Sequence, residues 1–163
     1  MMKKLEKAID VIKYLPFYML FAPFWFSNGV VDKFYGILFG TRHGDSWDGW
    51  KEYIAGTWSQ KPLTNTLLVP MYDYLFPVLI ALQILPVVLL IVSFLKLEIL
   101  PNRPKTLLKA GLLSSLFVTA SMAVSQTLAG ASDVQYLFQF WGVSLLAFWY
   151  VETQAKSLTP VTA

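Results

Sequence analysis

Residues 76–95 read FPVLIALQILPVVLLIVSFL, an almost unbroken apolar run. About 20 such residues are what a helix needs to cross a bilayer. The run shows no polar–apolar alternation, so it predicts a helix and not a strand of a membrane barrel. Three other stretches have the same character. The sequence therefore predicts an all-α, integral membrane four-helix bundle with spans at about 11–31, 75–95, 106–128 and 134–151, and it leaves open a continuation of the first helix to Gly40.

The composition agrees with a membrane protein. Of the 163 residues, 56% are hydrophobic and only 14% are charged, and the mean hydropathy is +0.53. A soluble domain has about 25% charged residues, and four buried helices would leave too few of them to cover the exterior. The aromatic content of 16% also disfavours a disordered chain. We expect one membrane domain over residues 1–163, in contact with membrane lipids.

The scarcity of metal-binding residue types excludes several kinds of site. The chain has no cysteine and a single histidine, His43. Disulfides, thiolate zinc sites, iron–sulfur clusters and bis-histidine haem are therefore excluded for this chain alone. We expect no metal site and no cofactor of the chain's own.

The basic residues predict the topology. Nine of them fall on one side of the predicted spans: Lys3, Lys4, Lys7, Lys13, Lys96, Arg103, Lys105, Lys109 and Lys156. Four fall on the other, despite its much longer connection: Lys33, Arg42, Lys51 and Lys61. The positive-inside rule then places both termini in the cytoplasm. The net charge of +3 is explained by this topology, so no nucleic-acid partner is predicted. A cleaved signal peptide is the alternative for the amino terminus, but its apolar stretch is longer than an h-region and no A-x-A site follows.

The long outer loop, residues 41–71, contains a predicted helix. In DSWDGWKEYIAGTWSQ, the residues Trp47, Trp50, Ile54 and Trp58 recur at helical spacing on one face. A tryptophan face of this kind is typical of a helix lying at the membrane interface. Three roles stay open for Trp47, Trp50 and Trp58: an interfacial anchor, a lid over a cavity between the spans, and a docking surface for a partner.

No predicted span carries a charge near its centre, which argues against independent ion or proton transport. The remaining polar groups lie mostly in the outer half of the bilayer. An apolar pocket with a few such groups would suit a quinone or a lipid. The candidate lining residues are Asn28, Asp32, Lys33, Asp73, Gln83, Gln126 and Gln139. The alternative is that these groups form interhelical hydrogen bonds, and no catalytic residue is assigned.

The third span carries a stripe of small residues: Gly111, Ser114, Val118, Ser121 and Ser125. Such a stripe lets another helix backbone approach closely. We expect it to pack against a partner subunit. Six aromatic residues are expected to face lipid or a partner: Phe24, Trp25, Phe26, Trp141, Phe148 and Trp149.

Three short motifs carry a family resemblance. The first span ends in SNGVVDKFYG, with Gly29, Asp32 and Lys33. The outer loop holds a Gly-Trp-x-x-Tyr element at residues 49–53, and LPNRPK joins the second span to the small-residue third span. With these motifs the chain resembles the DoxX/DoxD-like family of small four-helix membrane proteins. The family often carries an acidic residue early in the second span, where this chain has Gln83.

The resemblance implies a prokaryotic inner-membrane location. It also implies a role beside redox enzymes, since DoxD-like proteins occur as the membrane subunit of a thiosulfate:quinone oxidoreductase. The leading hypothesis is an accessory membrane subunit of a larger redox or respiratory complex that contacts quinone or lipid and other membrane subunits. The alternatives are a DoxD-like quinone-linked oxidoreductase acting with a partner subunit and a stand-alone lipid-binding membrane protein. The sequence does not decide whether the chain is an enzyme.

Overall fold

The structure, a computed structural model, describes residues 9–10, 12–39, 47–131 and 134–157. These residues form helices and connections, without strands, which confirms the all-helical class. The first long segment is continuous helix made of α2 (Leu15–Trp25), the π-helix η1 (Phe26–Tyr35) and α3 (Gly36–Phe39). The helix thus continues as far as Phe39, and Gly40 lies outside the described residues.

Three long helices follow, close to the predicted spans: α6 (Tyr72–Leu95), α7 (Thr106–Ala129) and α8 (Gln135–Ser157). The helix α7 ends at Gly130, whose φ of 73° is accessible to glycine at little cost. Within the described residues, two helical stretches are long and apolar enough to cross a membrane, Pro62–Leu95 and Thr106–Ala129. That all four segments cross a membrane stays a prediction.

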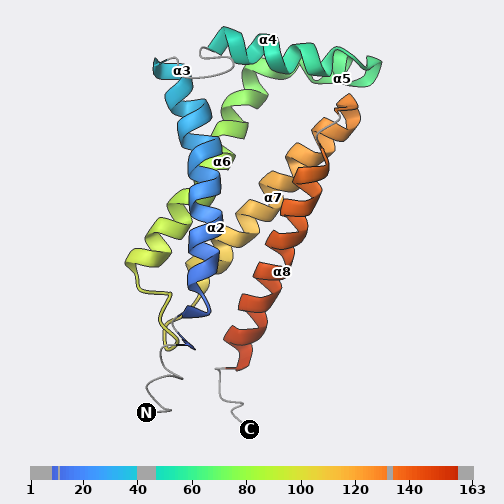
Figure 1. The fold of residues 1–163 in the computed structure, drawn as a ribbon. Coiled ribbons are helices and arrows are strands. Elements are labelled where there is room, and N and C mark those ends of the chain that lie inside the picture. Colours follow the sequence, from blue (N-terminus) through green and yellow to red (C-terminus); the bar gives the residue numbers. More distant parts are fainter. Residues whose placement is uncertain (1–8, 11, 40–46, 132–133, 158–163) are drawn as a thin grey trace.

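The outer loop is more helical than predicted. The expected helix is present as α4 (Trp47–Trp58), and it is followed by α5 (Pro62–Leu67) and the 3-10 turn η2 (Val69–Met71), which were not predicted. Pro62 stands at the start of α5, where its missing N–H and fixed φ favour a helix. Together α4 and α5 lie across one end of the long helices (Figure 1). At the opposite end, α2 begins and α8 ends.

Among the long helices, α6 contacts both α2 and α7, and α7 contacts α8. Aromatic rings join α2 to α8, where the ring centroids of Phe21 and Phe140 are 5.3 Å apart. A hydrogen bond of 2.8 Å from Trp25 Nε1 to Ser115 Oγ crosses the interior. Trp25, expected to face lipid or a partner, is therefore a core residue, because its indole finds its hydrogen-bond acceptor between the helices.

The small-residue stripe of α7 lets another helix approach closely, as predicted, but that helix is α6 of the same chain. Gly111 and Val118 are buried, and a Cβ at Gly111 would meet the side chain of Leu90 on α6 at 3.0 Å. Ser121, in contrast, is exposed. The inner part of the stripe thus serves the close approach of α6 and is not available to a partner subunit.

The distribution of polar and apolar side chains suits a protein that is surrounded by an apolar solvent. Polar side chains are enclosed between the helices, among them Gln83, Ser93, Ser115, Thr119 and Ser144. Large apolar side chains point outward, and those more than half exposed include Met19, Leu38, Phe39, Leu95, Phe117, Leu146 and Trp149. Monomeric soluble proteins rarely expose so much contiguous apolar surface.

Candidate ligand site beneath α4

The tryptophan face of α4 packs on the first turns of α6. Ring centroids of Trp47 and Trp50 lie 5.2 Å and 5.8 Å from that of Phe76. Trp58 lies 6.5 Å from Tyr72, and Tyr72 stacks on Phe76 at 4.9 Å. The helical spacing of the tryptophans is thus explained by burial against α6. A contact of this kind is what the lid alternative requires.

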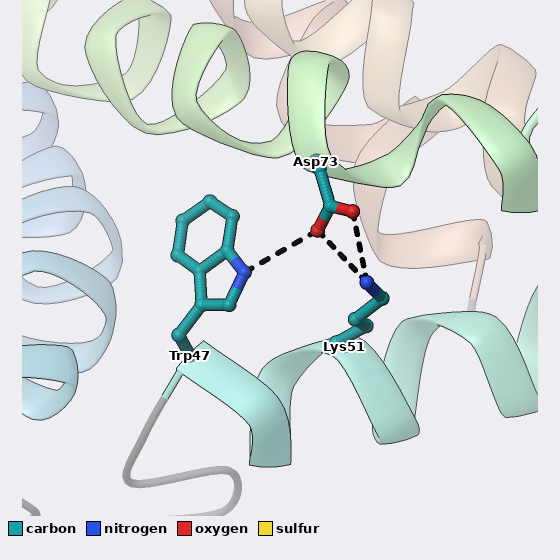
Figure 2. A network of polar contacts seen from close by, with 3 residues as sticks. All are labelled: Trp47, Lys51 and Asp73. Atoms are coloured by element: carbon teal, nitrogen blue, oxygen red, sulfur yellow. Dashed lines mark hydrogen bonds and ion pairs between the residues drawn. The ribbon is translucent and has the colours of Figure 1, made fainter.

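A polar contact joins the two helices beside this aromatic cluster (Figure 2). Lys51 Nζ donates to both carboxylate oxygens of Asp73 at 2.9 Å, and Trp47 Nε1 donates to Oδ1 at 3.4 Å. These interactions, led by the hydrogen bond from Lys51, lower the pKa of Asp73, which lies outside the predicted span. Both charged side chains are exposed, so this contact fastens α4 to α6 at the surface.

Lys33 lies on the enclosed side of α4. It is only 7% exposed, and its Nζ donates to the carbonyl of Asn28 at 3.1 Å. The same ammonium lies 5.0 Å from the ring centroid of Trp50, within the range of a cation–π interaction. Asp32, the residue before Lys33, is partly buried and supplies a negative charge close by. A lysine ammonium has three donors, so Lys33 can also donate to a ligand.

Two other donors in this region have no acceptor. Trp50 Nε1 and the hydroxyl of Tyr72 are buried, and neither has a hydrogen-bond partner. An unpaired buried polar group costs about 1–3 kcal/mol, so such groups are rare in native proteins. Trp50 lies beside Lys33, and Tyr72 stacks on Phe76, whose ring also contacts Trp50. This arrangement favours a bound group that accepts hydrogen bonds.

Gln83 lies deeper, where η1 meets α6. It is fully buried, its Nε2 donates to Met122 Sδ at 3.1 Å, and its Oε1 has no partner. A Cβ at Gly29 would come within 3.0 Å of the Gln83 backbone, so glycine is required for this approach. The π-helical turns of η1 surround Gly29, and π-helical turns occur frequently at functional sites.

Not all predicted site residues gather here. Asn28 Nδ2 donates to the carbonyl of Phe24 on its own helix, Gln126 is partly buried, and Gln139 is exposed. The four grooves described by the structure are lined by other residues. Lys33 contacts α4 at Trp50. Asp73 contacts the same helix elsewhere, at Trp47 and Lys51. Lys33 is therefore enclosed, whereas Asp73 is at the surface.

A lateral groove of about 360 Å³ leads away from α4 between η1, α3 and α6. Trp47 lines it at α4, and Phe34, Ile37, Pro77, Ile80 and Ile84 line it along the helices. Its lining is apolar throughout. An alkyl or isoprenoid chain would suit this groove.

A second polar centre, at the opposite end of the molecule, was missed from the sequence. Glu98, 4% exposed, accepts hydrogen bonds from Ser93 Oγ at 2.9 Å and from the backbone N–H of Leu108 at 2.8 Å. The hydroxyls of Ser93 and Tyr18 are 2.7 Å apart. Glu98 thus caps the start of α7 from the preceding connection. The one signal was an acidic residue inside an apolar stretch, LKLEIL.

Among the described residues, no three potential ligands converge as a metal site. Comparisons with protein-family models, with curated proteins and with solved structures find no match to this chain.

Proposed function

We propose that this protein is an accessory subunit of a larger redox or respiratory complex in a prokaryotic inner membrane, and that it holds a quinone headgroup beneath α4. In this proposal all four long segments cross the bilayer and both termini are cytoplasmic. The outward-facing apolar side chains and the excess of basic residues on one side support that topology.

The observation that carries the ligand proposal is the group of donors beneath α4. Lys33, Trp50 Nε1 and the Tyr72 hydroxyl can all donate to an oxygen acceptor. The surrounding rings favour a flat molecule, because aromatic pairs stack or meet edge to face at such distances. A quinone ring carries two carbonyl acceptors, and its chain would follow the lateral groove from Trp47 towards Ile84.

An anionic headgroup suits the site less well. Asp32 places negative charge close to Lys33, and Asp73 places it beside Trp47. Like charges at short range disfavour one another where the dielectric constant is low. A neutral carbonyl avoids this repulsion.

The accessory role is supported by the exterior of α8. Trp149 is 65% exposed, and Phe138 and Trp141 also point outward from this helix. Aromatic residues are enriched at protein–protein interfaces. A partner subunit covering α8 would also supply the redox groups that a quinone-linked complex needs.

Purification in mild detergent, with mass spectrometry of proteins and extractable lipids, tests this function. Stoichiometric redox subunits and quinone would support it. If the chain is isolated alone with quinone, the accessory role is wrong and the quinone site stands. If it is isolated alone with phospholipid only, the stand-alone lipid-binding alternative replaces both.

The enzyme alternative has one specific observation in its favour, the enclosed ammonium of Lys33. Positioned against a quinone carbonyl, it would stabilise the negative charge that develops on reduction. Turnover of thiosulfate by the purified complex, lost in Lys33→Gln with quinone still bound, would establish that alternative.

Two conservative variants test the ligand site directly. Tyr72→Phe and Trp50→Phe remove the two donors that have no acceptor in the empty protein. Without ligand, Tyr72→Phe should therefore unfold at the same temperature as the wild type or higher, while quinone retention falls about fivefold or more per lost hydrogen bond. Tyr53→Phe, an exposed tyrosine of α4, is the matched control. Unchanged quinone retention in both test variants would contradict the proposed site.

A further inference from the structure

A second groove lies far from α4, between α2 and α8. Its volume is about 470 Å³. Pro16, Phe17 and Leu20 line one side, and Val143, Leu146 and Tyr150 line the other. Leu20 and Leu146 are exposed, so the groove runs along the outer surface of the helices. It is a channel of the kind that an acyl chain fills.

The groove has one charged lining residue, Lys13, just before the first turn of α2. Lys13 Nζ pairs with Asp10 Oδ1 at 3.0 Å and lies 5.3 Å from the ring centroid of Tyr14. The ion pair is partly exposed and uses one of the three ammonium donors. Lys13 can therefore also bind an anionic oxygen at the end of the groove.

Tyr14 supplies a second, independent observation at the same end. It is fully buried, and its hydroxyl has no hydrogen-bond partner. Tyr150, which lines the groove, is close enough for the two hydroxyls to interact electrostatically. Lys105 Nζ lies 4.5 Å from the Tyr14 ring centroid. Tyr14 thus brings a second ammonium group to the end of the groove where Lys13 lies.

The charges at this end of the molecule favour an anion. The basic residues of its described part are Lys13, Lys96, Arg103, Lys105 and Lys109. The acidic ones are Asp10, Glu98 and Glu152. The carboxylate of Glu98 already accepts hydrogen bonds from Ser93 Oγ and from the backbone N–H groups of Leu107 and Leu108, and it interacts with the charge of Lys105. An excess of basic residues at a membrane surface attracts anionic lipids, each contributing about 1 kcal/mol.

We infer that the groove between α2 and α8 binds an anionic phospholipid. One acyl chain lies between Phe17 and Leu146, and the phosphate accepts a hydrogen bond from Lys13. The inference rests on the membrane location in the proposed function, but it does not depend on quinone or on a redox partner.

The full chain, purified in detergent and delipidated, is titrated with phosphatidylglycerol and with phosphatidylcholine, and bound lipid is counted by native mass spectrometry. We expect preferential binding of phosphatidylglycerol. Lys13→Gln should weaken it about three- to tenfold, since one basic residue contributes about 1 kcal/mol. The exposed Lys61→Gln, at the start of α5 and the other end of the molecule, is the control and should bind as the wild type does.

A matched pair of variants tests the groove itself. Val143→Trp fills it, whereas Val88→Trp adds the same bulk to an equally exposed position of α6 outside the described grooves. Val143→Trp should lose the bound lipid and Val88→Trp should keep it. Equal binding by the two variants, equal binding of the two lipids, or a dimer that Val143→Trp dissociates would each overturn the inference. Retention of the chain in carbonate-washed membranes tests the location separately.

Discussion

At the scale of single residues, Gly29 and Gly142 show how differently two helical glycines are used. A Cβ at Gly29 would meet the Gln83 backbone at 3.0 Å, whereas a Cβ at Gly142 would meet nothing within 4 Å. Gly29→Ala should therefore destabilise the protein by about 1–3 kcal/mol through overpacking. Gly142→Ala should stabilise it by about 0.5–1 kcal/mol, because alanine favours a helix. Thermal unfolding of both variants in the same detergent measures the difference, and shifts of the same sign would contradict the close approach of η1 to α6.

The sequence indicated some of these residues and not others. Lys33 and Gln83 could be selected because a charged or amide group next to an apolar stretch is unusual. Their partners could not be predicted, since Trp50 and Met122 are brought to them by other helices. Glu98 was missed because its acceptor role depends on the start of α7, which follows only after a turn of the chain.

At the scale of helices, the polar contact between α4 and α6 depends on one exposed carboxylate, that of Asp73. Asp73→Asn removes the ion pair with Lys51, so α4 should exchange its amide hydrogens faster while α7 stays protected. Glu52→Gln, an exposed acidic residue of α4, is the control and should leave the exchange of α4 unchanged. Equal protection of α4 in Asp73→Asn and the wild type would show that the tryptophan face holds the helix alone.

Acid should have the same effect as the Asp73→Asn substitution. The folded protein has a lowered pKa at Asp73, so the ion pair contributes stability above the unfolded pKa of the group. That contribution is lost as the pH falls through the lowered value. The amide hydrogens of α4 should therefore exchange more slowly in the wild type than in Asp73→Asn until the solution is strongly acidic.

The helices themselves were largely predictable, and the exceptions have physical causes. Apolar runs located α6 and α7 within a few residues, and the spacing of the tryptophans located α4. The π-helical turns of η1 were not predictable, because they accompany the approach of Gly29 to Gln83, a contact between distant parts of the chain. The short helix α5 was not predicted, since prolines such as Pro62 and Pro70 occur both in turns and at the start of a helix.

At the scale of the whole molecule, the two ends differ in kind. One end is covered by α4 and α5 and carries the aromatic cluster, and the other holds the basic connection between α6 and α7 (Figure 1). The two proposed ligands would occupy opposite ends, with quinone beneath α4 and phospholipid at Lys13. Such a separation requires that the two ends face opposite sides of the membrane.

Because the chain has no cysteine, single introduced thiols can test this topology. Gln60→Cys lies between α4 and α5, and Asn102→Cys lies between α6 and α7; both positions are exposed. A membrane-impermeant maleimide should label Gln60→Cys in intact spheroplasts and Asn102→Cys only after the membrane is permeabilised, since the basic connection is expected to stay in the cytoplasm. The reverse pattern would invert the topology. Labelling of both positions in intact spheroplasts would contradict a bundle whose ends lie on opposite sides, and it would remove the basis for placing the two ligands in different leaflets.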